Sequence, residues 1–469
     1  MHRSIAQGPA PDGRVRSRPA APGTRSTLLV GGGLVLVMLA LYLLTRPAWQ
    51  VLYTHFLWQA QAWLEGQSAI RWPVYPTATS PGSAHFHDVV AILGPDGAPT
   101  GRALIPFPPF PALVLLPLVA LFGLATDQGF VSVVLGALDV GVAFWLLGRL
   151  PVRPPIRIAL TVFLGAGTAL WYAASLGSTW YFAHVVSLAP ALLAVGLALD
   201  AEAADRGRRP GSPRRLLDGR QVAAGLLLGI AATSRLTMAV GLPFLLFVGG
   251  GGGWLRRGVS AILGASIPVL ALVVYTLVTT GQPFNPAYEV LYRSEVVAYP
   301  DLHYNAAWSL QDVRYIPQNL GIMLAGFPVI MPACEPGTAR SIWSATGCGV
   351  LVPRQVGTSL LLTSPAWLLA LPALRAIRRD RVVAGAALAT LGIATVNLMH
   401  FSQGWVQFGY RFSLDFAPFL LVLAALGTER LVAAPGRAGR RGAILAAVLV
   451  AASVAVQAWG LAWARTLGW

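Results

Sequence analysis

The sequence predicts an all-α polytopic membrane protein with about eleven transmembrane helices, a cytoplasmic N-terminus and an external C-terminus. Three observations predict this class. The 469-residue chain is 55% hydrophobic and only 11% charged, whereas soluble domains carry about 25% charged residues. Apolar stretches alternate with short blocks of arginine, and such blocks mark the cytoplasmic ends of spans. Two long polar stretches interrupt this pattern, and we expect them to form external loops at 46–127 and 280–358.

The N-terminal residues 1–26 are rich in Pro, Gly and Arg and have no apolar face. We therefore expect a disordered, basic cytoplasmic tail, followed by a single transmembrane domain over 27–469. The first span, 27–45, is too long for the core of a signal peptide and predicts an uncleaved anchor. The formal net charge is +16, and every one of the 34 Lys+Arg residues is an arginine. Because these arginines lie between apolar spans, their distribution indicates membrane topology and argues against a nucleic-acid partner.

All later arginine blocks can be cytoplasmic only under two conditions. The segment Phe110–Phe122 must not cross the bilayer, and at about 13 residues it is short for a span of roughly 20. The stretch 221–248 must be a hairpin of two short helices that turns at 233–237, because one continuous helix would place Arg235 at mid-membrane at a cost of about 2.5–3.5 kcal/mol. The predicted spans are 27–45, 128–148, 158–175, 182–199, 221–233, 236–248, 258–279, 359–374, 382–400, 413–428 and 442–462.

The first external loop contains the sequence His85-Phe86-His87-Asp88, a dense cluster of titratable groups in a chain with few charges. Under the predicted topology, six of the seven histidines fall at the external face together with most of the acidic residues. We interpret the segment 84–123 as the catalytic loop of a membrane enzyme. No metal-spaced Cys/His set and no phosphate-binding Gly-rich motif occurs in the sequence, so we expect neither a metal nor a bound cofactor.

The two cysteines, Cys334 and Cys348, lie in the second external loop. In an oxidising compartment they can form a disulfide, and closing a loop of about 15 residues contributes ~3 kcal/mol. The alternative is a pair of free thiols.

Several short motifs follow one another at the predicted external face. They are Tyr53-Thr54-His55, Ala62-x-Leu64-x-Gly66, His87-Asp88 with Pro106–Pro111, Gly177-Ser178-Thr179-Trp180-Tyr181 with His184, Thr233-Ser234-Arg235, and Gly404-Trp405-Val406-Gln407-Phe408-Gly409-Tyr410-Arg411-Phe412. Their order resembles the GT-C superfamily of polyprenyl-phosphate-sugar-dependent glycosyltransferases, the class of the aminoarabinose transferases and protein O-mannosyltransferases, over roughly 27–428. The resemblance implies a multi-span bundle whose first external loop holds an acidic base, with cationic residues that bind the lipid phosphate.

The resemblance assigns roles to particular residues. Asp88 is the candidate base, and His87 or His55 could share its proton; the alternative for Asp88 is a carboxylate that caps a turn. Many members of the superfamily carry an acid directly after the first span, where this chain has Thr54-His55, so the base is either Asp88 or His55. Arg235 and Arg411 are the candidate phosphate ligands, and snorkelling to the interface is their alternative. The remaining candidates for substrate binding are Tyr410, Trp405, Trp180 and His184.

We therefore expect a metal-independent glycosyltransferase of a bacterial cytoplasmic membrane, and the resemblance implies that it inverts the sugar carbon. Its active site faces outward, and it transfers a sugar from a polyprenyl-phosphate carrier to a lipid, glycan or protein acceptor. A flippase or transporter of lipid-linked sugars and a non-catalytic scaffold of an envelope-glycan machine are the alternatives. The titratable residues gather at one face and do not follow a path across the bilayer, which favours the enzyme.

Overall fold

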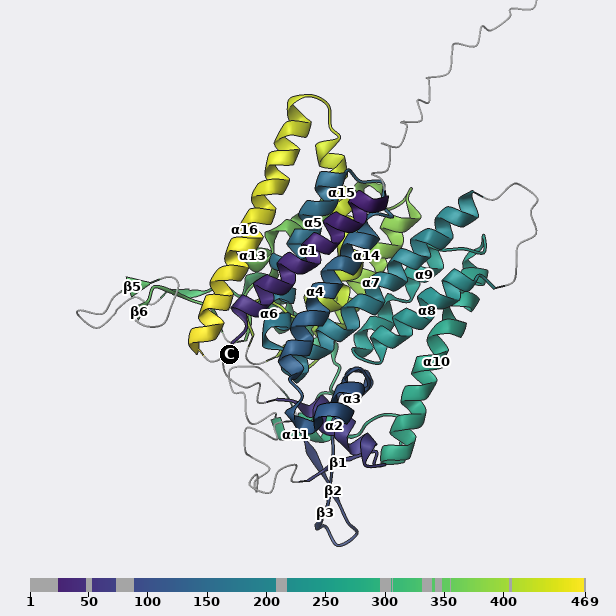
Figure 1. Ribbon diagram of the computed structural model, residues 1–469, viewed down its shortest axis with the longest axis vertical. Helices are drawn as coiled ribbons and strands as arrows, with labels where there is room; N and C mark the ends of the chain where they lie inside the picture. Colours follow the sequence, from purple (N-terminus) through teal and green to yellow (C-terminus); the bar gives the residue numbers. More distant parts are fainter. Residues whose placement is uncertain are drawn as a thin grey trace, which may run out of the picture.

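The computed structural model describes residues 24–47, 53–72, 88–207, 217–295, 305, 307–330, 340–341, 348–354, 356–404 and 407–467. These residues form an elongated bundle of helices (Figure 1), with the connection between α15 and α16 at one end and the small sheet β1–β3 at the other. The tail expected at 1–26 lies largely outside the described residues, and α1 (Thr24–Thr45) begins within its last three.

Six of the described helices are long and apolar enough to cross a membrane. They are α1, α4 (Gln128–Leu147), α7 (Thr179–Arg206), α10 (Trp254–Thr280), α14 (Arg381–Met399) and α16 (Arg437–Leu467). A seventh candidate is the pair α5 (Pro154–Ala166) and α6 (Ala169–Leu176), which meet at a bend of 48°.

The other predicted spans are shorter or more polar than a spanning helix, so the structure does not confirm a count of eleven. The segment 359–374 is divided into α13 (Leu360–Thr363) and the 3-10 helix η5 (Pro365–Ala376), since prolines at 365 and 372 interrupt regular α-helical hydrogen bonding. The helix α15 (Ser413–Val432) has sufficient length but contains Asp415, Glu429 and Arg430. The number of spans and their orientation stay predictions.

The predicted hairpin at 221–248 is present as a reversal of the chain. The helix α8 (Gly219–Ala232) ends one residue before Thr233, and Arg235 is extended. The chain then returns through η3 (Leu236–Gly241) and α9 (Pro243–Phe247). Gln221, in the first turn of α8, donates to the carbonyl oxygens of Leu245 at 2.7 Å and Val248 at 3.2 Å. The end of the returning segment therefore lies beside the beginning of α8, and Arg235 lies at the turn.

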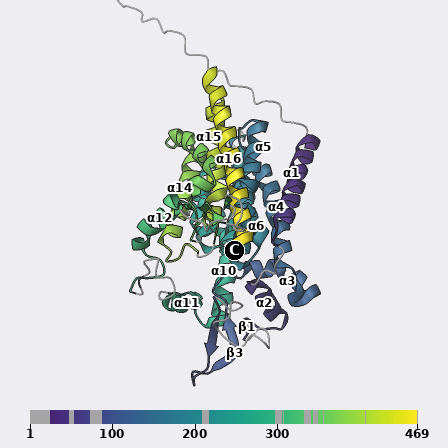
Figure 2. The same ribbon diagram turned by 90° about the vertical axis from the view of Figure 1, so that its left-hand side faces the viewer.

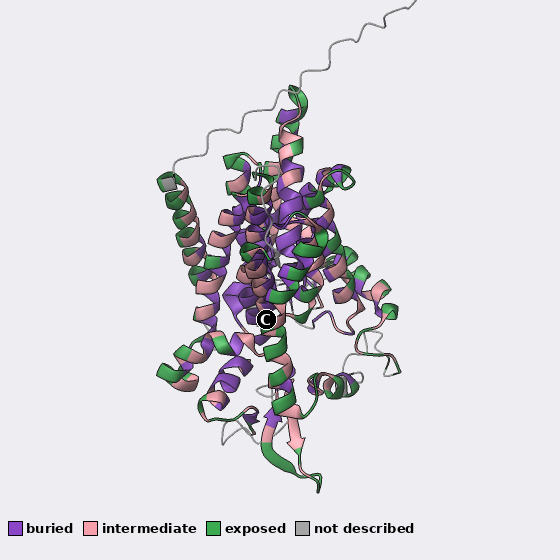
Figure 3. Ribbon diagram, turned by 90° about the vertical axis from the view of Figure 1, so that its right-hand side faces the viewer, coloured by how far each residue is buried: buried purple, intermediate pink, exposed green. Residues whose placement is uncertain are grey.

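The core of the bundle is built around α7, where 78% of the most apolar 18-residue window is buried. Figure 3 shows the buried residues concentrated in the centre, with exposed faces on the outer helices. In α10 only 17% of the corresponding window is buried, and its outward side chains include Ile262, Ile267 and Leu270. Lipid tails can cover such an apolar exterior, whereas water cannot do so favourably. The chain is accordingly a multi-pass membrane protein.

The first loop region packs below the bundle as a separate layer (Figure 2). It contains α2 (His55–Leu64), α3 (Phe110–Phe122) and η2 (Gly123–Ala125). The helix α3 has the bounds that the sequence predicted. The expectation of an all-α fold is wrong in detail, because β1 (Ile70–Arg71), β2 (Val90–Leu93) and β3 (Pro99–Leu104) form an antiparallel sheet in the order β1-β3-β2.

The second loop region is also mixed. It contains α11 (Ala287–Glu295), η4 (Val313–Tyr315) and α12 (Ile316–Ala325). Two strand pairs accompany these helices, β4 (Val329–Ile330) with β7 (Leu351–Val352) and β5 (Arg340–Ser341) with β6 (Cys348–Gly349). Strands of two residues are too short to show an alternation of apolar and polar residues, so they could not be recognised from the sequence.

Candidate functional site

The candidate residues come together at the end of the bundle opposite the connection between α15 and α16. Trp180 and His184 lie in the first two turns of α7, Arg235 follows α8, and Arg411 precedes α15. Each lies near the beginning or end of a helix. Apolar helices of similar length place their ends at two common levels, so these residues share one level. His55 opens α2, which packs beneath the same level.

Asp415 is the centre of a buried hydrogen-bond network. Its carboxylate accepts from His184 Nδ1 at 2.8 Å and from Thr237 Oγ1 at 2.7 Å. The Arg235 guanidinium donates to both oxygens, at 3.3 and 3.1 Å, and Asn397 Nδ2 donates at 3.3 Å. The side chains of Asp415 and His184 are fully buried. Five donors compensate the cost of burying this carboxylate, and they join α7, the 233–237 turn, α14 and α15.

The sequence analysis missed Asp415. A usable signal was present, because Asp415 is an acidic residue one turn after Arg411 at the start of an apolar span. Ionisable residues in such segments are rare and usually have a specific partner. The partner itself, 180 residues earlier at Arg235, could not be read from the spacing.

Arg411 differs from Arg235 in its surroundings. It is 8% exposed, and its guanidinium carbon lies 5.2 Å from the ring centres of both Tyr181 and Phe412. The backbone of Gly404 leaves room for it: φ is +86° there, and a Cβ would lie 2.6 Å from the guanidinium carbon. No carboxylate pairs with Arg411 among the described residues, and its Nε has no hydrogen-bond partner among them. A buried guanidinium without a counter-ion favours binding of an anion.

Asp88 is anchored at the entrance to β2. Trp180 Nε1 donates to Asp88 Oδ2 at 2.8 Å, which joins the first loop to α7. The φ of Asp88 is +60°, a left-handed conformation that Asp and Asn adopt more readily than most residues. Burial, and next the charge of Asp88, raise the pKa of the Tyr53 hydroxyl. The carboxylate is half-buried, and the Trp180 indole binds one of its two oxygens.

His55 is buried, and its tautomer follows from its contacts. The Thr179 hydroxyl donates to the carbonyl oxygen of Tyr53 at 2.9 Å, so it must accept from His55 Nδ1, which lies 2.9 Å away. The ring of His55 lies 5.8 Å from that of Phe107 and 5.9 Å from that of Trp180. His55 and Asp88 are therefore connected through a shared neighbour, Trp180. The sharing of a proton between them stays a prediction.

A row of rings leads from this region toward Arg411. Phe107 lies 6.1 Å from Tyr288, and Tyr288 lies 6.4 Å from His400. Gln311 Nε2 is 3.1 Å from His400 Nδ1, and a β-bridge pairs the same two residues. His400 is electrostatically coupled to Arg235 and Arg411. The two long loops thus meet the bundle at one shared location between Asp88 and Arg411.

The remaining predicted residues have different outcomes. The Tyr410 hydroxyl donates to Gln403 Oε1 at 2.7 Å and thereby fixes the loop before α15. His87 and Trp405 lie outside the described residues. Cys334 also lies outside them, and only the backbone of Cys348 is described, so the predicted disulfide stays a prediction.

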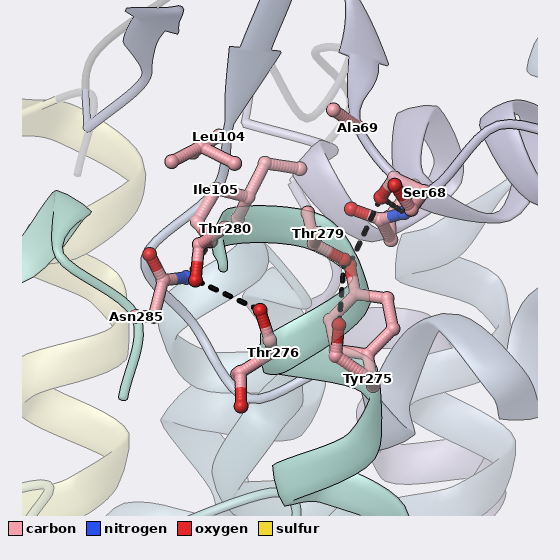
Figure 4. A pocket seen from close by; sticks show the side chains of 10 residues that line it. Ser68, Ala69, Leu104, Ile105, Tyr275, Thr276, Thr279, Thr280 and Asn285 are labelled. Carbon is pink, nitrogen blue, oxygen red and sulfur yellow. Dashed lines mark hydrogen bonds between the residues drawn. The ribbon is translucent and has the colours of Figure 1, made fainter. Parts of the chain in front are cut away.

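A small crevice lies between α10 and the first loop region (Figure 4). Its polar groups are largely paired with the protein: the Tyr275 hydroxyl donates to Ser68 O at 3.1 Å, and Asn285 Nδ2 donates to Ile105 O at 2.7 Å. These bonds hold the end of α10 against the loop layer. We regard the crevice as a structural junction.

The comparisons with known proteins identify the fold. No protein-family model and no curated protein sequence matches the chain. Two structures of an oligosaccharyltransferase from Archaeoglobus fulgidus are similar to it: the apo form, with a TM-score of 0.53 and 12% identity, and a form tethered to an acceptor peptide with the NVT sequon, with a TM-score of 0.50 and 13% identity. Each match covers 95% of this chain and 57% or 56% of the archaeal chain, respectively.

A third similar structure is ArnT from Cupriavidus metallidurans bound to undecaprenyl phosphate, with a TM-score of 0.45 and 13% identity over 95% of this chain and 78% of that chain. The archaeal oligosaccharyltransferase belongs to the GT-C superfamily. The chain therefore shares the overall fold of that enzyme, as the resemblance of its motifs implied, and it spans little more than half the length of the archaeal chain.

Proposed function

We propose that this protein is a membrane glycosyltransferase that transfers a sugar from a polyprenyl-phosphate carrier to an acceptor hydroxyl at the outer face of the cytoplasmic membrane. The observation that carries the proposal is the contrast between the two arginines on a GT-C fold. Arg235 is neutralised by Asp415, whereas Arg411 is buried without a carboxylate partner among the described residues. We therefore assign the carrier phosphate chiefly to Arg411.

The proposed chemistry is inversion at the anomeric carbon. The acceptor hydroxyl attacks from the face opposite the phosphate and loses its proton to Asp88, while the bond from the anomeric carbon to the phosphate oxygen breaks. The bonding electrons leave with the carrier phosphate, and Arg411 stabilises the added negative charge. Each step uses one group of this chain, and the reaction needs no nucleotide-sugar domain.

Asp88 is suited to the role of base because it is a half-buried carboxylate whose position is fixed. The indole of Trp180 fixes one carboxylate oxygen, and an indole carries no charge. His55 is the second candidate, since its protonated Nδ1 leaves Nε2 as the basic nitrogen. The acceptor, the sugar and the length of the prenyl chain are left open by this proposal.

The decisive experiment replaces Asp88 by Asn in a strain that lacks the native gene. Asn keeps the size of the side chain, accepts from Trp180 and tolerates the left-handed backbone, but it cannot take up the proton. We expect turnover to fall ~10²–10⁴-fold while carrier binding by the purified protein is retained. Mass spectrometry of envelope glycolipids and glycans then reveals loss of a sugar that the wild-type gene restores.

His55→Asn is the matched comparison, because its amide can still donate to Thr179 in place of Nδ1. Normal turnover in Asp88→Asn together with loss of turnover in His55→Asn would transfer the role of base to His55. If neither variant changes the glycan profile although the carrier still binds, the enzyme proposal fails and a lipid-linked-sugar flippase takes its place.

A further inference from the structure

His184 is a fully buried histidine with one nitrogen in use and one free. Its Nδ1 lies 2.8 Å from Asp415 Oδ1, whereas its Nε2 has no hydrogen-bond partner among the described residues. A buried polar atom without a partner typically destabilises a protein by about 1–3 kcal/mol. Native structures keep few such atoms, and each one calls for an explanation such as strain, a catalytic role or a bound water or ion. The free nitrogen of His184 therefore needs an explanation that the fold alone does not give.

The network around Asp415 sets the proton positions on the imidazole. The Asp415 carboxylate accepts from Arg235 and Thr237 as well, so it is an acceptor toward His184, and Nδ1 must carry the hydrogen. A second proton on the ring would add another buried cation beside Arg235 and Arg411. The neutral ring is therefore favoured, and Nε2 presents a lone pair that can accept one hydrogen bond.

Arg411, which is electrostatically coupled to His184, supplies a second buried group. Arg411 Nε has no partner among the described residues, and the Arg411 guanidinium carbon lies 5.2 Å from the ring centre of Phe412. The ring of His184 lies 5.7 Å from the same centre. The Phe412 ring thus borders both a cationic donor and a neutral acceptor. A ligand that spans the two groups and satisfies both has an anionic oxygen and a hydroxyl.

We infer that His184 Nε2 and Arg411 together bind the carrier lipid as a phosphate monoester in its singly protonated form. This inference rests on the proposed function and adds to it the form of the carrier that the site prefers. The donor is a phosphodiester, whose phosphate has no hydroxyl. Transfer of the sugar leaves a monoester, whose second pKa is about 6, so near that pH it offers both the anionic oxygen and the hydroxyl. His184 accepts from the hydroxyl, and Arg411 donates to the anion.

Asp415 acts here as a positioning residue, since it fixes the tautomer of His184 from the side away from the ligand. The charged groups packed against His184 are Asp415 on α15, Arg235 after α8 and Arg411 before α15; Tyr181, on the same helix, contacts Arg411. None of these neighbours offers a second carboxylate that would stabilise a proton on Nε2. Nε2 therefore stays an acceptor, and the ligand hydroxyl can donate to it.

The test uses two short ligands without sugar, farnesyl phosphate and its methyl ester, with the full-length protein in detergent micelles. At about pH 6 we expect the wild type to bind the monoester roughly tenfold more tightly than the methyl ester, the value of one hydrogen bond to a charged group. At about pH 8 the preference should shrink, because the monoester has lost the proton. The methyl ester should bind equally at both pH values.

His184→Asn is the decisive variant, because its amide can replace Nδ1 toward Asp415 but does not reach the position of Nε2. We expect it to lose the preference for the monoester while its affinity for the methyl ester and its unfolding temperature stay close to wild type. His184→Gln, whose amide oxygen can occupy the position of Nε2, should retain part of the preference. A merely structural role for His184 predicts equal losses for both ligands.

Two outcomes overturn the inference without touching the proposed function: equal binding of the two ligands by the wild type, or an unchanged preference in His184→Asn. The proposed function has its own control, since Arg411→Ala should weaken both ligands alike. If the wild type binds neither ligand, or if Arg411→Ala leaves both affinities unchanged, the carrier site itself is wrong and the inference is overturned with it.

Discussion

Two groups of arginines, one at each end of the bundle, differ in their surroundings. At the end near the α15–α16 connection, exposed arginines pair with carboxylates, as in Arg206 with Glu202 at 3.0 Å and Arg153 with Glu429 at 3.1 Å. The side chains of these two arginines are 64% and 44% exposed. At the candidate-site end, the side chain of Arg235 is 18% exposed and Arg411 is 8% exposed as a whole residue. The first group is hydrated, and the second depends on partners that the protein or a ligand must supply.

This difference shows which arginine charges affect stability and binding. An exposed ion pair stabilises a protein by about 0–1 kcal/mol, because water solvates both partners when they separate. A buried charge that loses its partner destabilises by about 3–5 kcal/mol. The exposed arginines of the first group therefore support the predicted topology, whereas the buried ones of the second group affect local structure and binding. Three experiments test this contrast between the two groups of arginines, and the largest effect is expected for the first.

The assignment of the two ends to the two sides of the membrane gives an all-or-none result. Ala98, between β2 and β3, and Ala438, at the start of α16, are both exposed and lie at opposite ends. In a protein whose two native cysteines are replaced by serine, an impermeant maleimide should label Ala98→Cys on intact cells and should label Ala438→Cys only after lysis. The reverse pattern would place the candidate site on the cytoplasmic side and refute the proposed outward-facing reaction.

Removing the carboxylate at the centre of the buried network should give the largest change in stability. Asp415→Ala leaves Arg235 without its counter-ion and His184 Nδ1 without its acceptor, so we expect a loss of about 3–5 kcal/mol. Glu429→Ala is the control, because it breaks the Arg153 pair near the surface and should cost no more than about 1 kcal/mol. Denaturant unfolding in detergent measures both, and equal losses would abolish the distinction between the two ends.

Replacing Arg411 by Lys should change binding more than stability. Lys keeps the charge but loses the planar pair of donors, so we expect carrier affinity to fall roughly ten- to hundredfold. No carboxylate among the described residues loses a partner, so the free energy of unfolding should change by less than in Asp415→Ala. Arg153→Lys at the other end should leave carrier affinity unchanged. Equal carrier binding by Arg411→Lys and wild type would remove Arg411 from the phosphate site.

The broad organisation of this protein could be predicted from its sequence. Arginine blocks and apolar stretches predicted a helical membrane protein. The desolvation cost of a charge within a span does not depend on how the helices pack, so it can be read from the sequence. The same penalty predicted the break beside Arg235, and the prolines and limited length of the segment Phe110–Phe122 predicted its short helix. Strands of the first loop were not predicted, since β1 and β3 pair across an intervening stretch of the chain.

Sequence also determined that Arg235, His184 and Arg411 would lie at one end, because each borders an apolar helix. Which of them pairs with the Asp415 carboxylate became clear only from the tertiary structure. Asp415 lies four residues from Arg411, yet it pairs with Arg235 across 180 residues and with His184 across 231. The physical reason is that a carboxylate in an apolar interior takes the donors that the packing of α7, α8 and α15 brings to it, and neighbours in sequence can point elsewhere.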